Sequence, residues 1–442
     1  MKTKVAVIIP VFNAGKYVAA LARSLEVAYP KAQPNLRFVF TDDGSTEKDV
    51  SALYDSYRFF KRTDVHVIRN KKNIGYTRNV NLAISKTAKN EDIVLLNSDT
   101  EVSAGLFENL QKIALANPMC ASVTPTTNLG TIASLFNWPN GMHMNGPIST
   151  TDINEAMKSN GSELKAIQIP TPVGFCMYMP KDVILQVGYF DELKFPRGYG
   201  EENDWACRAT SFGLRHYLAV GIFVKHASGK SFKETKNALI TDALVRLSKD
   251  HPTYQRSVME HVQFDPWEED RWNLSLKISR AQRLKRGRKL IAFVLHNDPE
   301  HVGGGVESTV KNLSKKHIEN DYDVIQVFKA RDALNIRYLS SDDFDWHVRI
   351  TRGKGDVVQR LSQIFEDLEV LHVHHLLGLG QELVTYLAQL RGPLKKITLH
   401  DYWTVCPAIK LVDSNQNYCG IPKEKDACNK CLVKKFPHER YD

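Results

Sequence analysis

The sequence of 442 residues has no apolar run approaching the roughly 20 residues that cross a bilayer as a helix. It also has no apolar signal segment near its start, because the polar residues 1–4 lead directly into an expected strand. Internal repeats and low-complexity segments are absent as well. We therefore expect a globular, cytoplasmic protein, and contact with the inner face of the cell membrane stays open as an addition.

Cysteine is scarce, with seven residues in the chain. Three of them are isolated in apolar or amphipathic surroundings, which is typical of inert core thiols in a reducing compartment. The others gather near the C-terminal end and finish in a Cys-x-x-Cys pair: Cys406, Cys419, Cys428 and Cys431. Four such thiolates can hold a structural Zn²⁺ ion, and free thiols or disulfides are the alternatives.

Charge of one sign is concentrated in a single place. The formal net charge is +9, but most basic residues alternate with acidic ones, and the dense run lies at 277–289. We expect this run to form a solvated linker helix, with contact to an anionic membrane surface as the alternative. No aromatic residues interleave with these charges, so we expect no nucleic-acid partner.

Strands and helices alternate along the first half of the chain, which predicts parallel βαβ units and a doubly wound α/β sheet. The strands are expected at 5–9, 36–40, 65–69, 92–96 and 174–179, and the helices at 14–27, 77–86 and 180–187. Between them, residues 118–172 are rich in Asn, Gly, Pro and Thr. We interpret that stretch as a long irregular loop with a functional role.

The composition changes around 264–272, first to acidic and aromatic residues and then to basic ones. We place the domain boundary here, with a first domain at 1–265, a basic helical linker at 266–288 and a second α/β domain at 289–442. The second domain is expected to contain a glycine-rich turn, 303–305, followed by a helix. Its expected elements are strands at 290–295, 324–328, 370–373 and 396–399 and a helix at 306–316.

Chemically active residues follow the expected strands of the first domain, where open α/β sheets bind ligands. The first strand ends at Pro10 and Phe12, and the second ends in a turn with Asp42 and Asp43, whose carboxylates can accept hydrogen bonds from a nucleobase or a ribose. A turn and helix start then offers Asn73, Gly75 and Arg78, with backbone close to a ligand and a cation for a phosphate. Asp99 follows a buried strand and is a hard oxygen ligand suited to Mg²⁺ or Mn²⁺.

Taken together, these motifs resemble a family-2 glycosyltransferase of the GT-A fold, an inverting class that uses nucleotide-sugar donors. The resembling text is VAVIIPVFNAGKYV, TDDGST, NKKNIGYTRNVNLAI, IVLLNSDTEV, GFCMYMPKDV, GYGEENDWACRATSFG and VKHASGKSF, in family order over residues 5 to 232. The resemblance implies that Asp42 and Asp43 contact a uracil- or thymine-type base. It also implies that Asp99 is the retained metal ligand of an Asp-x-Asp motif, in which Asn97 replaces the first Asp.

An acidic cluster, Glu201, Glu202 and Asp204, follows a glycine-aromatic turn. An inverting transfer needs a base that takes the proton of the acceptor hydroxyl. The family pattern places this base at Glu202, with Asp204 as the alternative, and Glu201 could orient a hydroxyl group. The structural interpretation, an acidic helix start favoured by the helix dipole, also stays open. The family position that pairs with these carboxylates is Arg208.

His226 follows an expected strand, and the resemblance makes it a candidate metal ligand beside Asp99. Without that resemblance, a single histidine at a strand end is typical of a hydrogen-bonded structural residue.

The second domain resembles the amino-terminal half of a family-4 glycosyltransferase of the GT-B fold. The resembling text is the glycine-rich turn, VLHVHHL at 370–376 and ITLHDYWTVCP at 397–407. The second Rossmann-like half of that fold is not recognisable in the sequence, so we interpret this domain as an incomplete GT-B unit. The resemblance makes His400 and Asp401 acceptor-side residues.

From these observations we predict a metal-dependent hexosyl- or deoxyhexosyltransferase that uses Mn²⁺ or Mg²⁺. Its donor would be a UDP- or dTDP-linked sugar, and its acceptor a glycan or a lipid-linked glycan in surface polysaccharide or glycoconjugate synthesis. No Gln-x-x-Arg-Trp motif follows the acidic cluster, which favours addition of one or a few sugars. The alternative is a non-catalytic sugar-nucleotide-binding or scaffold module of an assembly complex.

Overall fold

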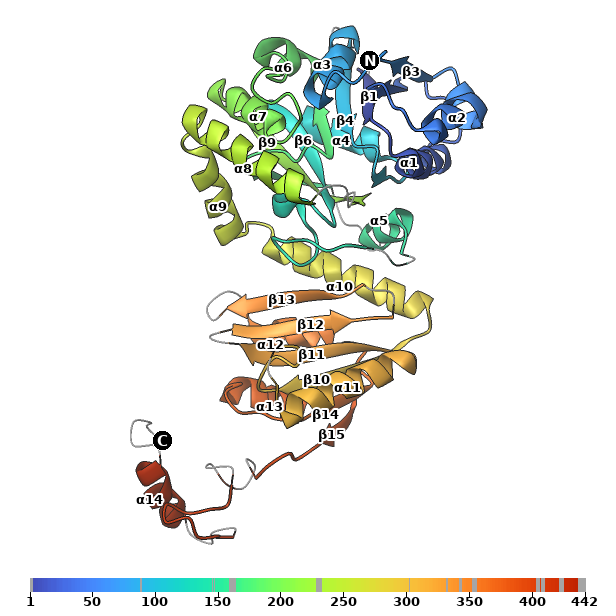
Figure 1. Cartoon of the computed structure of the whole chain (residues 1–442). Helices are drawn as coiled ribbons and strands as arrows, with labels where there is room; N and C mark the ends of the chain where they lie inside the picture. Colours follow the sequence, from blue (N-terminus) through green and yellow to red (C-terminus); the bar gives the residue numbers. More distant parts are fainter. Residues whose placement is uncertain are drawn as a thin grey trace. The chain divides into compact units, whose positions relative to one another are not determined.

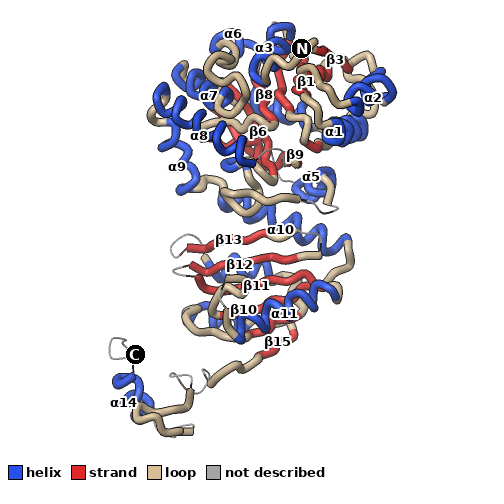
Figure 2. Tube along the Cα trace, viewed as in Figure 1, coloured by secondary structure: helices blue, strands red, loops and turns tan. Residues whose placement is uncertain are grey.

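The computed structural model describes residues 3–87, 90–144, 146, 148–158, 164–227, 233–301, 303–330, 333–341, 344–351, 356–402, 406, 410–420 and 425–435. The chain divides into two compact units, Met1–Gln282 and Arg283–Asp442. Figure 1 labels the helices and strands of both units, and Figure 2 shows that each unit combines a sheet with flanking helices. The α/β class predicted from the sequence is therefore confirmed for both units.

The first unit is organised around a curled, mixed sheet. In the described residues its strands are β1 (Lys4–Val11), β2 (Leu36–Asp42), β3 (Val65–Arg69), β4 (Glu91–Leu96), β5 (Thr100–Glu101), β6 (Cys120–Thr127), β7 (Lys165–Ile169), β8 (Cys176–Met179) and β9 (Arg215–His226). Their order is β3-β2-β1-β4-β8-β6-β9-β5, with β7 paired to β9. The strands β3, β2, β1 and β4 are parallel, and β8 joins them in the antiparallel direction.

Helices cover both faces of this sheet (Figure 1). The described α-helices of the unit are α1 (Gly15–Ala28), α2 (Lys48–Ser56), α3 (Tyr76–Thr87), α4 (Leu106–Ala116), α5 (Thr150–Lys158), α6 (Lys181–Val187), α7 (Glu201–Ser211), α8 (Lys233–Asp250), α9 (Tyr254–Phe264) and α10 (Glu268–Lys285). Two short 3-10 helices, η1 (Arg58–Lys61) and η2 (Thr131–Ala133), complete the unit.

Strand β1 shows why helices pack on both faces of the sheet. Its odd positions, such as Val7 and Ile9, pack into one core with α1 and α4, whereas Ala6 and Ile8 pack into the other with α3, α6 and α7. Successive side chains of a strand point to opposite faces, so an uninterrupted apolar run is typical of a strand buried on both sides. Each large aliphatic side chain buried here contributes about 1.5–3 kcal/mol.

The expectation of one irregular loop at 118–172 is wrong. This stretch contains β6 in the middle of the sheet, the helix α5 and the strand β7. All eight residues of β6 are buried, and several of them are polar. Their hydroxyl groups are satisfied inside the protein, because Ser122 Oγ lies 2.7 Å from His216 Nδ1 and Thr126 Oγ1 donates to the carbonyl of Ile222. Internal hydrogen bonds thus allow a polar sequence to form a core strand.

The second unit contains a smaller mixed sheet. Its described strands are β10 (Lys289–Leu295), β11 (Tyr322–Ala330), β12 (Ala333–Leu339), β13 (Trp346–Thr351), β14 (Val370–Val373) and β15 (Leu394–Ile397). The order is β13-β12-β11-β10-β14-β15, in which β11, β10, β14 and β15 are parallel and β12 and β13 are antiparallel additions. The helices described here are α11 (Gly305–Glu319), α12 (Val357–Ile364), α13 (Gln381–Gln389) and α14 (Lys425–Lys435).

The expectation of a solvated linker helix at 277–289 is wrong for part of that run. Arg283 and Arg288 are buried, at 5% and 8% exposure. Arg283 pairs with Asp367 at 2.8 Å, and Arg288 pairs with the buried Asp323 at 2.7 Å. These positive charges are used inside the second unit, so they are not available to an anionic surface. Among the described residues no helix is long and apolar enough to cross a membrane.

Candidate functional site

The turn after β2 holds the two neighbouring carboxylates, Asp42 and Asp43, and both are buried. Asp42 accepts from the backbone N–H of Ser45 at 2.8 Å and from Arg69 Nε at 2.9 Å. Asp43 accepts from the backbone of Ile74 and Gly75 at 2.9 and 3.0 Å. The two carboxylates therefore fix the turns that surround the carboxyl end of β2. Their contact with a nucleobase stays a prediction.

Gly75 stands where only glycine fits. Its φ is +94°, and a Cβ atom at this position would lie 2.6 Å from the carbonyl oxygen of Pro196. The same turn places Asn73 Oδ1 3.1 Å from the backbone nitrogen of Gly75. Arg78, one turn into α3, is exposed, with its Nε 3.8 Å from Glu192 Oε1. Its guanidinium is accessible to an anionic ligand.

The end of β1 lies beside this turn in the sheet, because β1 and β2 are paired up to Val11 and Asp42. Pro10 is buried within β1, whereas the ring of Phe12 just beyond it is half exposed. The next residue, Asn13, accepts at its side-chain oxygen from the backbone N–H of Thr46 at 2.8 Å. Phe12 therefore offers an accessible aromatic face next to a fixed loop.

Asp99 and His226 come together at the other end of the site. β5 pairs with β9 so that Thr100 stands opposite His226, and the N–H of Ala227 donates to the carbonyl of Asp99 at 2.8 Å. His226 Nε2 lies 3.3 Å from Asp99 Oδ1. Asn97, in the preceding turn, donates from its backbone N–H to Phe175. The structure thus places both predicted metal ligands side by side.

The hydrogen bonds of His226 show which ring nitrogen carries the hydrogen and which one directs a lone pair at Asp99. Its Nδ1 lies 3.2 Å from the carbonyl oxygen of Leu129, which can only accept, so Nδ1 carries the hydrogen. In the neutral ring Nε2 is then the acceptor directed at Asp99. A backbone carbonyl that holds the far nitrogen is the usual support of a metal-binding histidine. The Phe175 ring stacks on the imidazole at 5.3 Å and fixes its plane.

Two acceptor atoms facing each other require a proton or a cation between them, which suits the chemistry of a divalent metal site. Among the described residues no group of three or more His, Cys, Asp or Glu side chains is arranged to hold a metal ion. A cation at Asp99 and His226 would therefore need further oxygen ligands from water or substrate. Mg²⁺ and its relatives are commonly bound in this way, by one or two protein ligands plus the phosphates of the substrate.

Glu201 and Glu202 open α7 after Gly200, whose φ of +112° suits glycine. Burial raises the pKa of both carboxyl groups, and the charge of Glu202 raises that of Glu201 further. Glu201 Oε2 is buried and has no hydrogen-bond partner among the described residues. Glu202 Oε2 accepts from the backbone N–H of Gly200 at 3.3 Å. A carboxylate with a raised pKa is a stronger base than an ordinary one.

Two tyrosines link the acidic cluster to the candidate metal ligand, and we did not predict either of them from the sequence. Burial raises the pKa of Tyr76, and the charges of Glu201, Glu202 and Asp99 raise it further. Burial followed by the same three charges also raises the pKa of Tyr199. The geometry at Gly198 agrees with this for Tyr76, because a Cβ atom added there would lie 3.3 Å from the Tyr76 ring and 3.8 Å from Glu201 Oε2.

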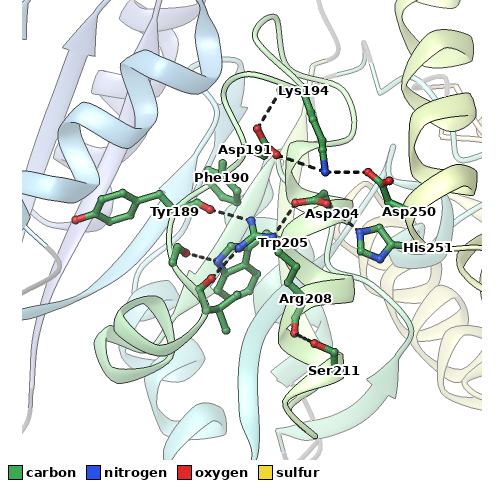
Figure 3. Close-up of polar contacts among 12 residues, drawn as sticks. Tyr189, Phe190, Asp191, Lys194, Asp204, Trp205, Arg208, Ser211, Asp250 and His251 are labelled. Carbon is green, nitrogen blue, oxygen red and sulfur yellow. Dashed lines mark hydrogen bonds and ion pairs between the residues drawn. The ribbon is translucent and has the colours of Figure 1, made fainter.

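Asp204 has different surroundings, which Figure 3 shows. Its Oδ2 accepts from Arg208 Nε at 2.8 Å, and its Oδ1 lies 2.9 Å from His251 Nε2. Arg208 also donates to the carbonyls of Val187 and Tyr189, each at 2.8 Å. This network joins α7 to the turn after α6 and to the loop before α9.

The second unit gathers histidines at the carboxyl ends of its parallel strands. His296 follows β10, His374 and His375 follow β14, and His400 and Asp401 follow β15. His374 Nδ1 lies 2.8 Å from His400 Nε2, and His375 Nε2 lies 3.4 Å from Asp401 Oδ2. Burial lowers the pKa of His374 to about 3, which keeps the ring neutral. The acceptor-side role of His400 and Asp401 stays a prediction.

The four C-terminal cysteines are free thiols in the structure, and two of them, Cys428 and Cys431, lie one turn apart on α14. Burial raises the pKa of Cys428, and the charges of the other three thiolates raise it further. Among the described residues, which include these four cysteines, no three such side chains are arranged to hold a metal ion. Zinc binding by this cluster stays a prediction.

Comparison with known proteins agrees with the motifs of the first unit. Residues 6–188 match the family model described as Glycosyl transferase family 2. A segment of 110 residues is 28% identical to the Glycosyltransferase GlyG of Streptococcus pneumoniae serotype 4 (strain ATCC BAA-334 / TIGR4), which covers 25% of this chain and 35% of that protein. The chain thus spans about a third of the length of this relative. The family model thus matches less than half of the chain, and all of the matched residues lie in the N-terminal unit.

Among solved structures, the chain is similar to GalNAc-T7 with UDP, GalNAc and Mn²⁺, with 13% identity and a TM-score of 0.42 over 71% of this chain and 54% of that one. It is also similar to the mannosyltransferase PcManGT of Pyrobaculum calidifontis in complex with GDP-Man and Mn²⁺, with 13% identity and a TM-score of 0.41 over 72% and 80%. A third similar structure is S. aureus TarS 1-349, with 15% identity and a TM-score of 0.36 over 63% and 80%.

Proposed function

We propose that the first unit is an inverting, metal-dependent glycosyltransferase that uses a nucleotide-diphosphate sugar. The observation that carries this proposal is that Asp99 Oδ1 and His226 Nε2 face each other at 3.3 Å in the unit that also holds Glu201 and Glu202 at the start of α7. Asp99 and His226 would supply cation ligands and Glu202 a basic carboxylate, in a unit whose residues 6–188 match the family 2 model.

Asp99 and His226 would hold the cation, Mn²⁺ or Mg²⁺. The fit rests on the facing pair of acceptor atoms, Asp99 Oδ1 and His226 Nε2, 3.3 Å apart. When bound, a divalent cation would neutralise the charge that develops on the leaving diphosphate. The backbone carbonyl of Leu129 and the ring of Phe175 keep the imidazole in the orientation that this role requires.

Glu202 would act as the general base. The acceptor oxygen attacks the anomeric carbon while the bond from that carbon to the diphosphate oxygen breaks, and the bond pair leaves with the nucleoside diphosphate. The proton of the acceptor hydroxyl moves to Glu202, whose raised pKa favours its capture. Attack opposite to the leaving group inverts the anomeric centre.

The remaining residues would bind the donor. Phe12 offers an accessible ring for stacking on a base, and the Asp43-supported turn brings the backbone near Gly75 close to the ligand. Arg78 at the start of α3 would pair with a phosphate. Asp42 would act on the base side through the loop that it fixes. A uracil or thymine base is the expectation from the family pattern.

We further infer that the acceptor is a glycan or a lipid-linked glycan in surface polysaccharide or glycoconjugate synthesis. This inference rests on the match of residues 6–188 to the family 2 model, and the absence of a Gln-x-x-Arg-Trp motif after the acidic cluster favours addition of one or a few sugars. The acceptor would be served from the cytoplasmic side of the cell membrane.

The decisive experiment is a donor screen. UDP- and dTDP-linked sugars are incubated with the full chain and Mn²⁺ or Mg²⁺, and the released nucleoside diphosphate is measured. Turnover that needs the cation and is lost in Asp99→Ala supports the proposal. Tight donor binding without turnover, under every cation and acceptor tried, would instead support the alternative of a non-catalytic sugar-nucleotide-binding module, which the Asn97 replacement favours.

A further inference from the structure

A cavity of about 280 Å³ lies directly beside Glu202 in the first unit. One side is formed by Tyr199, Gly200 and Glu202 at the start of α7. The opposite side comes from α8 and α9, which follow the family-matched segment in the chain. The residues that decide its chemistry are Tyr199, Glu202, Ala243, Leu244, Leu247 and Tyr254.

The wall formed by α8 is apolar and follows helical spacing. Ile240, Ala243, Leu244 and Leu247 recur at three- and four-residue intervals, so they lie on one face of the helix. Ala243 and Leu247 also pack against Phe195, which attaches this face to the body of the unit. The wall is therefore fixed in place by a core contact.

The end of the cavity near the base is polar. Asn203 donates to Thr171 Oγ1 at 3.1 Å, and Thr171 and the α9 residue Tyr254 both line the cavity. Burial raises the pKa of Tyr254, and the charge of Glu202 raises it further, which places this tyrosine close to the base. The cavity thus combines a proton-accepting carboxylate at one end with an apolar wall along its side.

The cavity also borders the donor side. Tyr199 lines it directly after Gly198, where an added Cβ atom would lie 3.3 Å from the Tyr76 ring and 3.8 Å from Glu201 Oε2, and the charges of Glu201 and Asp99 help to raise the pKa of Tyr199. Tyr199 has a φ of 63°, a backbone conformation that aromatic residues rarely adopt. A ligand in the cavity would therefore lie beside Glu202, with the Tyr199 ring between it and the candidate metal site.

Size and charge restrict what the cavity can hold. Ligand pockets usually measure about 300–1,000 Å³, so this one is suited to about one substituted ring. Glu201 and Glu202 disfavour a phosphate or carboxylate group inside it, and the apolar wall leaves hydroxyl groups without partners. The long chain of a polyprenyl lipid exceeds the volume, so a lipid-linked acceptor would keep its chain outside the cavity.

We propose that this cavity binds the acceptor, and that the acceptor carries a compact, uncharged apolar ring next to the hydroxyl that reacts. The inference rests on the function proposed above, because it assigns the acceptor class to the same base. An aryl glycoside has this chemistry, since the sugar hydroxyl can reach Glu202 while the aglycone ring lies against Leu244 and Leu247. A methyl glycoside of the same sugar lacks the ring.

The test compares p-nitrophenyl glycosides with methyl glycosides of glucose, galactose and N-acetylglucosamine. With the full chain, Mn²⁺ and the donor found in the screen, we expect kcat/KM for a nitrophenyl acceptor to exceed that of its methyl partner by about tenfold or more, because an apolar ring leaves water. Leu244→Trp should fill the cavity and lower nitrophenyl transfer by about tenfold or more. Donor hydrolysis by water should stay within about twofold, since the metal site is untouched.

Val245→Trp is the matched control, because Val245 is the next residue of α8 and is 66% exposed. It should leave transfer unchanged. If Leu244→Trp folds poorly, Val258→Phe narrows the cavity from α9, and Met259→Phe, on an exposed neighbour, is its control. Circular dichroism of each variant checks the fold.

Three results would overturn the proposal: equal use of nitrophenyl and methyl acceptors, an equal loss of transfer and hydrolysis in Leu244→Trp, or an equal loss in both tryptophan variants. A loss of hydrolysis would place the donor in the cavity. Ligand-observed NMR of the same glycosides measures binding without turnover. It therefore decides the acceptor proposal even if the donor screen shows no transferase activity. A failure of the acceptor proposal can thus be distinguished from a failure of the proposed function.

Discussion

His251 Nε2 lies 2.9 Å from Asp204 Oδ1, while Arg208 Nε lies 2.8 Å from the other oxygen of the same carboxylate (Figure 3). Both oxygens of this buried group thus serve to fix α7 and the segment that leads into α9. Among the described residues, no ion pair is found at Glu201 or Glu202. The acidic cluster therefore divides into a positioning residue, Asp204, and two carboxylates available for chemistry.

Replacing Asp204 should destabilise the protein. Asp204→Ala leaves Arg208 and His251 without their shared partner, and breaking a buried pair costs about 3–5 kcal/mol. We expect a clear fall of the Tm in thermal denaturation. Asp250→Ala removes an exposed carboxylate that neighbours His251 in the chain but pairs with Lys194, and it should leave the Tm almost unchanged. A Tm of Asp204→Ala equal to that of the unmodified chain would show that the network does not support the fold.

Replacing Glu202 should remove transfer and leave donor binding intact. Glu202→Gln keeps the size of the side chain but cannot take the proton, and a general base contributes about 10²–10⁴-fold to the rate. We expect kcat to fall by this range while calorimetric binding of the donor with Mn²⁺ stays within about threefold. Glu155→Gln, on the exposed side of α5, is the control. Transfer by Glu202→Gln at the full rate would assign the base to another group.

Replacing Asp99 should remove the dependence on the cation. Asp99→Ala leaves His226 as a lone ligand, and we expect metal-stimulated nucleotide release to fall by about 100-fold or more. Asp99 is partly exposed, so the far-ultraviolet circular dichroism should not change. The control is Asp55→Ala, an exposed acid on α2. Unchanged stimulation by Mn²⁺ in Asp99→Ala would refute the metal role.

The raised pKa values of Glu201 and Glu202 predict a pH effect on stability. In the folded chain both carboxyl groups hold their protons above the usual glutamate pKa of about 4.3. The stability that their neutral forms contribute is therefore complete below that value and is lost as the pH rises through the raised pKa. Glu201→Gln is neutral at every pH, so its Tm should exceed that of the unmodified chain more at pH 8 than at pH 4.5.

The raised pKa of Glu202 also predicts how kcat depends on pH at the acid end of the profile. Glu202 must lose its proton before it can act as a base, so kcat should rise with pH through a pKa above about 4.3. A pH profile of kcat with saturating donor and Mn²⁺ measures this limb. Two results together would contradict burial as the cause of the raised pKa values. They are an equal Tm difference between Glu201→Gln and the unmodified chain at pH 4.5 and pH 8, and a rise of kcat through the ordinary glutamate pKa.

The C-terminal cysteines predict bound zinc. If Cys406, Cys419, Cys428 and Cys431 bind the ion, the purified full chain should contain about one equivalent of Zn²⁺ by elemental analysis. The variant Cys428→Ser should lose it, whereas Cys207→Ser in the first unit should retain it. Zinc-free protein after expression with added Zn²⁺ would show that these residues are ordinary thiols.

The sequence predicted those elements whose apolar patterns are continuous. The bounds of β4 and β10 agree with the expected ranges to within one residue, because both strands consist largely of an uninterrupted apolar run. β6 was missed because its threonines and serine resemble loop residues until their partners, such as His216, are known. The antiparallel strands β12 and β13 were missed because their pairing partners are set by the tertiary fold.

Some residues of the candidate site could likewise be predicted from the sequence, whereas others depend on the tertiary fold. Asp99, His226 and Glu202 could be named from motifs, because each follows a recognisable strand or turn. Tyr254 could not be named from the sequence, since α9 begins about fifty residues after Glu202. The position of Tyr254 near Glu202 depends on how α8 and α9 fold back onto the unit. Nor could the sequence show that Asp204 is enclosed by Arg208 and His251, because that arrangement depends on tertiary hydrogen bonds.

The division of the site along the chain has an evolutionary consequence. The turns that we assign to the donor lie within 6–188, whereas the apolar wall beside Glu202 is supplied by the two helices that follow β9. Under the proposed function, substitutions in this helical pair would alter the preferred recipient of the sugar without disturbing the residues that activate it. Homologues that share the nucleotide half could therefore diverge in the molecules they modify through a segment of some thirty residues, and exchanging that segment between them offers a direct route to new pairings of sugar and recipient.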